Sequence, residues 1–461
     1  MIRHACGLFG LSGHRDAARY AYFGLYAQQH RGQESAGIAT WDGSVLHEQR
    51  GTGLVPDVFN EAGLQKLPGD YAIGHVHYGT HATASLRNAQ PFTAHHQGMA
   101  MALAHNGRLV NAEGLRRGLE EDGVIFQTSG DCEIFMHLIV RAMRRKSLED
   151  AILDACSRVR GSYCLVLLVG DTLIGLRDPR GIHPLVLGRL EACHVLVSET
   201  CALDLLEAEY VRAVEPGEMV VVRNGSVRSI RLAPVQTPRQ CVFELVYFGR
   251  PDSRIFDEQV YLCRKRMGWQ LAFETTPEVD FVMPFPDSGV YAAVGFAQCG
   301  ELPYEHAMIR NHYVGRTFIQ PTQGMRNFSA RMKINPVRPI IAGKRICVVD
   351  DSIVRGTTML VRVKKLRALG AREVHVRISC PPVRFPCWYG IDFTSRGELV
   401  AAARPVEEIR RILDVDSLHY LSLEGLARSL AHPDHYCRAC LTGEYPVAPE
   451  ETGRTPELGA P

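Results

Sequence analysis

Short apolar segments dominate the first half of the chain. Residues 71–76 and 162–168 are mostly apolar and have the length of β-strands. Between such segments, residues 16–29 and 131–143 carry apolar positions at the spacing that is typical of amphipathic helices. This interleaving predicts a mixed α/β region from Cys6 to about residue 222.

A polar, turn-rich passage over residues 223–239 predicts a boundary between two domains. Beyond it, apolar strands alternate with helices, as they do in a doubly wound sheet. The clearest strands lie at residues 280–285, in the segment that ends at Asp350, and at residues 374–378. The last ten residues, 452–461, are rich in glycine and proline and are expected to form a frayed tail.

Length and composition restrict the classes of function. At 461 residues the chain is long for a single core, which predicts two or three domains. The balance of 52 basic and 50 acidic residues gives no electrostatic reason to expect a nucleic acid or membrane partner. The apolar runs are too short to span a bilayer and the N-terminus lacks a secretory apolar region, so we expect a cytoplasmic protein that acts on small molecules.

Residues 346–358 carry the strongest chemical signal. An apolar strand delivers Asp350 and Asp351 to its C-terminal end, where open α/β sheets place their ligands. Carboxylates at that place suit ribose hydroxyls or a hydrated magnesium ion. Gly356 and two threonines follow, at the N-terminus of a helix expected to begin near Met359, where backbone N–H groups face an anion. A sugar phosphate fits both halves of this run, whereas the acidic pair alone would favour an ordinary solvated turn.

This run resembles the phosphoribosylpyrophosphate (PRPP) signature of the type I phosphoribosyltransferases. Two further segments resemble that family: residues 284–289, as a pyrophosphate-binding loop, and residues 313–321, as a mobile loop that closes over PRPP and completes an ammonia passage. The resemblance implies that magnesium is held by Ser288, Asp350 and Asp351. It implies that PRPP is bound by Asp287, Ser288, Gly289, Arg316, Asp350, Asp351, Ser352, Arg355, Gly356, Thr357 and Thr358.

Near the N-terminus, Cys6 opens the segment 6–10, Cys-Gly-Leu-Phe-Gly. A lone cysteine beside glycines is more often a packed thiol than a nucleophile. However, this segment, together with residues 29–38 and 104–107, resembles the class II glutamine amidotransferases, which are N-terminal nucleophile hydrolases. The resemblance implies that residues 1–5 are a removable propeptide, because a free α-amino group is the base that deprotonates the thiol.

The same resemblance assigns roles around the thiol. The side-chain amide of Asn106 and the backbone N–H of Gly107 would form the oxyanion hole. Asp131 matches the residue that receives the α-ammonium group of glutamine, and a helix N-cap is its structural alternative. The glutamine-binding residues implied in this way are Arg31, His77 and Asp131.

His77 departs from the family pattern, which has an arginine at this position to grip the α-carboxylate of glutamine. A neutral imidazole has one donor, so the bidentate contact is lost, and Arg87 is a candidate to replace it. The histidines at 75, 77 and 81 also invite a metal interpretation, which is disfavoured because only His75 and His77 share a face of the expected strand.

Fourteen cysteines without a secretory signal do not form a disulfide framework, so most are expected to be buried thiols in a reducing compartment. Cys437 and Cys440 form a CxxC unit, which alone is compatible with zinc, redox chemistry or coincidence. With Cys241 and Cys387, they lie in contexts that resemble the Bacillus-type branch of the amidotransferases, where four such cysteines ligate a [4Fe–4S] cluster. The spacing itself does not separate iron–sulfur from zinc.

Taken in order, these motifs resemble the glutamine PRPP amidotransferases over nearly the whole chain. The resemblance implies an α/β protein: an N-terminal nucleophile αββα sandwich followed by a type I phosphoribosyltransferase doubly wound sheet. The expected segments are a propeptide (1–5), a glutaminase domain (6–230), a phosphoribosyltransferase domain with the iron–sulfur ligands (231–451) and a flexible tail (452–461).

The implied reaction converts PRPP and glutamine or ammonia to 5-phosphoribosylamine, the first step of de novo purine synthesis. The implied cofactors are Mg²⁺ and a [4Fe–4S] cluster, and the implied assembly is a homotetramer inhibited by purine nucleotides. The altered glutamine pocket leaves an alternative: a diverged relative that uses free ammonia, or a non-catalytic regulatory or scaffold protein.

Overall fold

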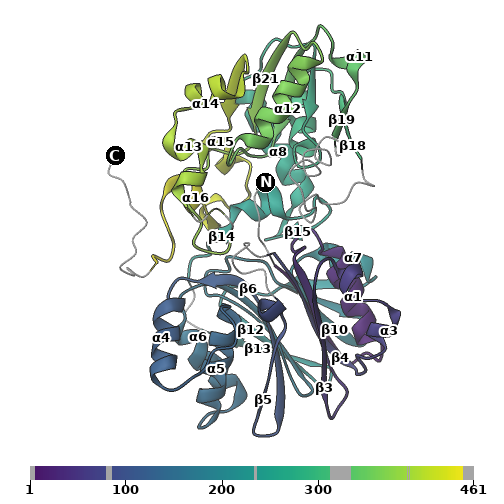
Figure 1. Cartoon of the computed structure of the whole chain (residues 1–461), viewed down its shortest axis with the longest axis vertical. Coiled ribbons are helices and arrows are strands. Elements are labelled where there is room, and N and C mark those ends of the chain that lie inside the picture. The colour runs from purple at the N-terminus through teal and green to yellow at the C-terminus, as the bar shows by residue number, and fades with distance from the viewer. Residues whose placement is uncertain are drawn as a thin grey trace.

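The computed structural model describes residues 6–78, 86–232, 236–311, 334–391, 393 and 395–449. The chain forms two halves, of which the first, drawn in purple to teal in Figure 1, is built on two sheets that face each other. The second half is built on a smaller sheet flanked by helices (Figure 1).

The first half contains two antiparallel sheets. The seven-stranded sheet has the order β11 (Glu209–Ala213), β9 (Val186–Leu190), β10 (Cys193–Val197), β1 (Gly7–Ser12), β4 (Tyr71–His77), β2 (Ser35–Trp41) and β3 (Leu46–Thr52). The six-stranded sheet has the order β13 (Ser226–Arg231), β12 (Glu218–Arg223), β8 (Thr172–Arg177), β7 (Gly161–Val169), β6 (Met99–Leu109) and β5 (Phe92–His96). The main helices are α1 (Ala17–Ala27), α4 (Ala112–Glu121), α5 (Asp131–Met143), α6 (Leu148–Arg158) and α7 (Thr200–Leu205).

Alternation along the strands produces three apolar cores and therefore four layers. On β1, Leu8 packs in the core between the two sheets, whereas Phe9 and Leu11 pack against α1. On β6, Ala104 faces the other sheet and Leu103 packs in the core beneath α5 and α6. The helices lie outside both sheets (Figure 1), so the predicted αββα sandwich is confirmed.

The second half is an open parallel sheet of four strands, β17 (Phe281–Pro284), β20 (Arg345–Asp350), β21 (Glu373–Ile378) and β22 (Ser417–Tyr420). Cys347 and Val349 pack on one face against α8 (Val260–Glu274) and α9 (Val290–Cys299). Ile346 and Val348 pack on the other face against α12 (Thr357–Ala368) and α14 (Val406–Leu413). Helices on both faces of a parallel sheet are the doubly wound arrangement that the sequence predicts.

Most expected elements appear close to their predicted places. Helix α5 spans residues 131–143 as expected. Strand β4 extends beyond its predicted segment by one residue at its C-terminal end, and β7 extends by one residue at each end. The passage at 223–239 differs, because its first part includes the edge strand β13. The pairing of β13 with β12 extends the six-stranded sheet through residue 231.

None of the helices in the described residues combines the length and the apolar character needed to cross a membrane.

Candidate functional site

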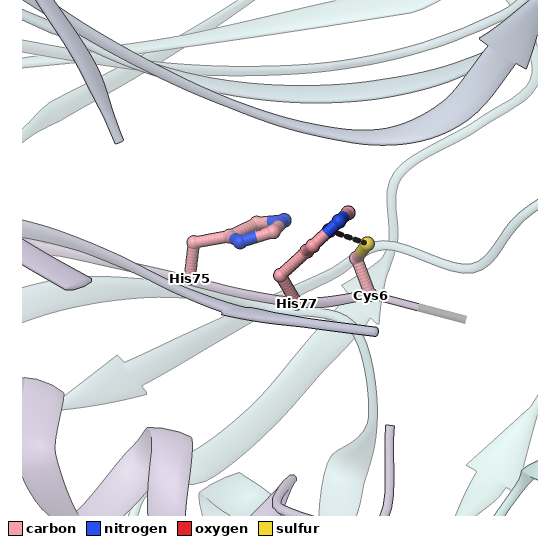
Figure 2. Close-up of side chains that lie close together, drawn as sticks. All are labelled: Cys6, His75 and His77. Carbon is pink, nitrogen blue, oxygen red and sulfur yellow. Dashed lines mark hydrogen bonds between the residues drawn. The ribbon is translucent and has the colours of Figure 1, made fainter. Parts of the chain in front are cut away.

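The thiol of Cys6 lies between the two sheets of the first half. Cys6 immediately precedes β1, and it shares the inward face of that strand with Leu8. In the antiparallel register, Gly7 pairs with Val76, so the next pair along is Cys6 and His77. The Cys6 Sγ atom lies 3.4 Å from the Nδ1 atom of His77 (Figure 2).

Asn106 is oriented by the backbone of the nucleophile. The Cys6 nitrogen donates a hydrogen bond to Asn106 Oδ1 at 3.2 Å, which leaves the amide nitrogen as a donor. This Nδ2 atom is buried and has no hydrogen-bond partner among the described residues. A buried donor without a partner is costly unless a ligand satisfies it, so the amide is arranged as an oxyanion donor would be.

Gly107 can only be glycine in this arrangement. Its φ of +140° lies in a region that L side chains rarely adopt, and an added Cβ would lie 2.2 Å from the carbonyl oxygen of Ser162. Glycine at this position allows β6 to lie this close to β7. The pairing of the two strands fixes the backbone of Asn106 and Gly107, the two residues of the predicted oxyanion hole.

Burial controls protonation around the thiol. It raises the pKa of Cys6 to about 11 and lowers the pKa of His77 to about 4. The pKa of His75 is also well below its usual value, chiefly because of burial. Near pH 7 the thiol is therefore protonated and both imidazoles are neutral, so the thiol needs a better base than these rings.

Arg31 lies in a buried ion-pair network rather than facing open space. Its Nε donates to the carbonyl oxygen of Cys6 at 3.1 Å, and its two Nη atoms donate to Glu244 at 3.0 and 2.6 Å. One Nη also contacts Glu199. Although burial opposes ionisation, Glu244 and Glu199 raise the pKa of Arg31 further. These contacts favour a role in positioning Cys6 over direct contact with glutamine.

Asp131 is the first residue of α5, and Gly130 occupies the N-cap position that was the structural alternative for Asp131. The Oδ2 atom of Asp131 accepts a hydrogen bond from the backbone of Leu109 at 2.7 Å. Burial raises the pKa of this carboxyl group, and the nearby charges of Arg108 and Arg116 oppose that shift. Arg87, the candidate replacement for the missing arginine, lies in the 3₁₀ turn Leu86–Asn88 with its side chain exposed.

The acidic pair of the second half lies at the C-terminal edge of the parallel sheet. Asp350 ends β20, and Asp351 follows; both are buried. Ser288 Oγ donates to Asp350 Oδ1 at 3.4 Å. Gly289 lies so close to β20 that an added Cβ would be 2.4 Å from the Val349 carbonyl oxygen. This close approach brings the predicted pyrophosphate loop against the acidic pair.

The electrostatics of the acidic pair fit a divalent cation. Burial, and then the charge of Asp351, raise the pKa of Asp350 well above its usual value. The nearest cation among the described ion pairs of Asp350 is Arg362, with Nη1 at 3.4 Å from Oδ2. Two adjacent buried carboxylates with a serine hydroxyl are an oxygen donor set suited to Mg²⁺, which would relieve their repulsion.

The predicted phosphate loop caps α12. Gly356 is the N-cap residue in the left-handed conformation, with φ of +77°, and Thr357 and Thr358 form the first turn. This helix N-terminus presents backbone donors suited to an anion. Arg355 Nη2 pairs with Glu398 at 2.7 Å, and Ser352 donates its hydroxyl to Asp351.

At the other end of the site, Asp287 forms an ion pair with Arg310. Arg316 and residues 313–321, the predicted mobile loop, lie outside the described residues.

The four predicted cluster cysteines are buried, although they come from distant parts of the chain. Strand β14 (Gln240–Cys241) pairs with β23 (Tyr436–Cys437), so Cys241 lies beside Cys437. Burial, and then the charges of Cys387, Cys437 and Cys241, raise the pKa of Cys440 well above its usual value. Mutually close buried thiols of this kind fit a metal cluster, which would hold them as thiolates.

Three residues at these sites escaped the sequence analysis. Arg362 lies one helical turn beyond Thr358, so the i, i+4 spacing on α12 is a signal that would have placed it near Asp350. Glu199 and Glu244 are 168 and 213 residues from Arg31 along the chain, and no local pattern connects them.

Comparison with known proteins decides the family. Residues 77–205 match the family described as glutamine amidotransferase domain. The chain is 46% identical over 459 residues to the chloroplastic amidophosphoribosyltransferase of Vigna aconitifolia, an alignment that covers 99% of this chain and 94% of the relative. The identity to the amidophosphoribosyltransferase of Bacillus subtilis is 44% over 453 residues, covering 97% and 95%. The chain belongs to the amidophosphoribosyltransferase family.

Solved structures support membership of the amidophosphoribosyltransferase family at the level of the fold. The B. subtilis glutamine PRPP amidotransferase complexed with ADP and GMP gives a TM-score of 0.91 at 43% identity, covering 97% of this chain and 98% of that one. A structure described as the allosteric regulatory enzyme of purine biosynthesis gives a TM-score of 0.93 at 43% identity, covering 98% of each chain.

Proposed function

We propose that this protein is an amidophosphoribosyltransferase that releases ammonia from glutamine and places it on carbon 1 of PRPP. The products are 5-phosphoribosylamine, pyrophosphate and glutamate, and the pathway is purine synthesis. The observation that carries the proposal is the presence of both sites in one chain: the Cys6–Asn106 arrangement between the two sheets, and the buried acidic pair beside the α12 loop. Family membership over nearly the full length supports the same activity.

In the first half, Cys6 Sγ attacks the carboxamide carbon of glutamine. The thiol proton needs an acceptor, and removal of residues 1–5 supplies the α-amino group of Cys6, with a pKa of about 7.7 to 8.0. The developing oxyanion accepts hydrogen bonds from Asn106 Nδ2 and from the Gly107 N–H. Ammonia leaves, a thioester remains on Cys6, and water hydrolyses it to glutamate.

Glutamine recognition differs from the family pattern at His77. Asp131 is proposed to receive the α-ammonium group, and Arg31 to hold Cys6 in position through its contact with the Cys6 carbonyl oxygen. His77 is a neutral ring whose Nδ1 atom meets the thiol, so it offers the α-carboxylate no bidentate contact. We therefore expect a higher KM for glutamine than the arginine-containing family pattern would give.

In the second half, Ser288, Asp350 and Asp351 would hold Mg²⁺, which would supply positive charge to stabilise the departing pyrophosphate. Gly356, Thr357 and Thr358 bind the phosphate on carbon 5 of the ribose at the N-terminus of α12. Asp287 and Gly289 line the pyrophosphate, with Ser352, Arg355 and Arg316 completing the proposed PRPP site. The lone pair of ammonia forms the new C–N bond as the C–O bond to pyrophosphate breaks.

The remaining proposals concern cofactor, assembly and location. Cys241, Cys387, Cys437 and Cys440 would hold a [4Fe–4S] cluster. The same four thiols would also suit zinc, and the family resemblance is what favours the cluster. A homotetramer, inhibition by purine nucleotides and a cytoplasmic location are carried over from the family resemblance and the composition.

The test measures pyrophosphate released from PRPP with glutamine and, separately, with ammonium. The proposal predicts release with both donors and one glutamate per pyrophosphate in the glutamine reaction. Cys6→Ser is the matched control and should abolish only the glutamine reaction. Release with ammonium alone from the wild-type protein would reject the glutaminase half of the proposal, and no release with either donor would reject the whole.

A further inference from the structure

Cys6, His75 and His77 form a compact cluster of soft and borderline metal ligands. His75 and His77 alternate on β4 and therefore share its inward face, and the strand register places Cys6 opposite His77. One ligand atom from each of the three residues lies within 4.8 Å of the other two (Figure 2). The sequence disfavoured a metal site formed by the histidines at 75, 77 and 81, because only His75 and His77 share a face of the strand. His81 lies outside the described residues, and the third ligand of this cluster is Cys6.

The separation between the thiol and His77 suits a shared metal ion. Sulfur and nitrogen ligands on one tetrahedral zinc ion, at bond lengths of about 2.3 and 2.05 Å, lie about 3.6 Å apart. Cys6 Sγ and His77 Nδ1 are 3.4 Å apart. An ion placed between them therefore needs little movement of either side chain.

His75 is the third ligand of the cluster, and its two ring nitrogens have different surroundings. Its Nε2 atom lies 3.1 Å from the carbonyl oxygen of His105, so Nε2 carries the proton and donates it. The other ring nitrogen, Nδ1, keeps its lone pair and is buried with no hydrogen-bond partner among the described residues. His75 itself is completely buried. In Figure 2 the ring nitrogen of His75 that lies toward His77 and Cys6 is Nε2, so a bound ion would replace its contact with the His105 carbonyl oxygen, and the proton would move to Nδ1.

We propose that Cys6, His75 and His77 bind a divalent cation of the zinc class and that the bound ion switches off the glutaminase. The donor set of one sulfur and two imidazole nitrogens favours Zn²⁺ over Mg²⁺ or Ca²⁺, which prefer oxygen. A water molecule completes the coordination, or the α-amino nitrogen of Cys6 does so after residues 1–5 are removed. Binding converts the thiol to a thiolate and releases one proton to solvent, with no change of oxidation state.

The regulatory consequence rests on the proposed function of Cys6, because the sulfur that binds the ion is also the nucleophile. A coordinated thiolate no longer attacks glutamine. The acidic pair that serves PRPP lies in the other half of the molecule and does not include these ligands. Zinc should therefore stop transfer from glutamine and spare transfer from ammonium.

The binding test uses calorimetric titration of the anaerobically purified, full-length protein with Zn²⁺, in two buffers with different heats of ionisation. We expect one tight site that releases a proton. His75→Gln and His77→Gln should each weaken this site by roughly a hundredfold or more. The matched control is His95→Gln, which changes an exposed histidine of β5 outside the cluster and should bind zinc like the wild type. Equal zinc binding by all four proteins, or no tight site in the wild type, would overturn the proposal.

The activity test adds one equivalent of Zn²⁺ and then a chelator. Glutamine-dependent release of pyrophosphate should fall at least tenfold and recover with the chelator, while ammonium-dependent release stays within twofold of its starting value. Inhibition of both reactions to the same extent would overturn the regulatory claim. The binding readout does not depend on turnover, so a protein that binds zinc but never uses glutamine would refute the proposed glutaminase and leave the metal site standing.

Discussion

The protonation of Cys6 is the residue-scale property on which glutamine use depends. With the Ala5–Cys6 peptide bond intact, burial holds the pKa of the thiol at about 11, so only about one thiol in ten thousand is ionised at pH 7. Because the pKa is raised, the reactive thiolate appears only as the pH increases. Removal of residues 1–5 would place an amine beside the thiol that accepts its proton near pH 8.

We predict that alkylation of Cys6 by iodoacetamide in the unprocessed chain accelerates about tenfold per pH unit between pH 7 and 10. Peptide mass spectrometry measures the rate at this cysteine alone. The processed chain should react faster at pH 8, while the buried Cys156, whose pKa is raised to about 12, serves as the internal control in both. A rate at Cys6 that levels off below pH 9 in the unprocessed chain would contradict this account.

A second residue-scale prediction concerns the acidic pair. Asp350→Asn combined with Asp351→Asn should lower ribosylamine formation by roughly a hundredfold or more with either nitrogen donor, because the charges that hold magnesium are lost. Glutamine hydrolysis without PRPP should stay within twofold. The matched control is Asp414→Asn, at the exposed C-terminal end of α14. Unchanged ribosylamine formation in the double variant would refute the role of the pair.

Sequence motifs predict the candidate catalytic and substrate-binding residues better than they predict the residues that position them. Cys6, Asn106 and the acidic pair lie in short recognisable runs, and the structure brings Asn106 to Cys6 and Ser288 to Asp350 as expected. For Arg31, the motif does not predict the contacts that the structure shows. Its motif implies contact with glutamine, whereas its donors meet Glu199 and Glu244, which long-range folding alone brings to it.

At the scale of elements, the close approach of β6 to β7 positions the oxyanion hole. We predict that Gly107→Ala lowers kcat for glutamine by roughly a hundredfold, because a Cβ would collide with the Ser162 carbonyl oxygen and displace the strand. Ammonium-dependent transfer should remain within twofold.

The matched control for this change is Gly118→Ala on the exposed face of α4, where an added Cβ meets nothing within 4 Å. It should raise the free energy of unfolding by roughly 0.5 to 1 kcal/mol and leave both reactions unchanged. Thermal unfolding followed by CD separates a folding defect from a local one. Full glutamine activity in Gly107→Ala would show that the strand tolerates the collision.

Elements with strong apolar periodicity were predictable, and the edge strand was not. Helix α5 and strand β20 bury most of one or both faces, so their patterns reveal their type and limits. Strand β13 is almost entirely exposed, and four of its six residues are serine or arginine. Its place in the sheet depends on backbone pairing with β12, which leaves no signal in local hydrophobicity.

At the scale of the whole molecule, buried groups connect the two halves. Arg31 of the first half pairs with Glu244 of the second, and Glu244 also meets His183 Nδ1 at 3.4 Å. The proposed cluster lies close to this region, because Tyr389, two residues after Cys387, accepts hydrogen bonds at its carbonyl from Ser162 and His183. Loss of the cluster should therefore lower the stability of both halves of the protein against unfolding.

We predict that anaerobically purified protein is brown and contains four iron atoms and four acid-labile sulfides per chain, as one [4Fe–4S] cluster requires. Cys437→Ser should lose both and unfold at a lower temperature. Cys156→Ser, a buried cysteine of α6 far along the chain from this group, is the matched control and should retain the cluster. Stoichiometric zinc without sulfide in the wild type would overturn the assignment.

The central claim is that one chain moves nitrogen from glutamine to PRPP. The most direct measurement supplies glutamine labelled with nitrogen-15 in its amide, PRPP, magnesium and an excess of unlabelled ammonium, and determines the label in trapped phosphoribosylamine by mass spectrometry. The account predicts that most of the product carries the label and that Cys6→Ser removes it while product still forms from ammonium. Wild-type product that is almost entirely unlabelled would contradict the claim that the two sites work together.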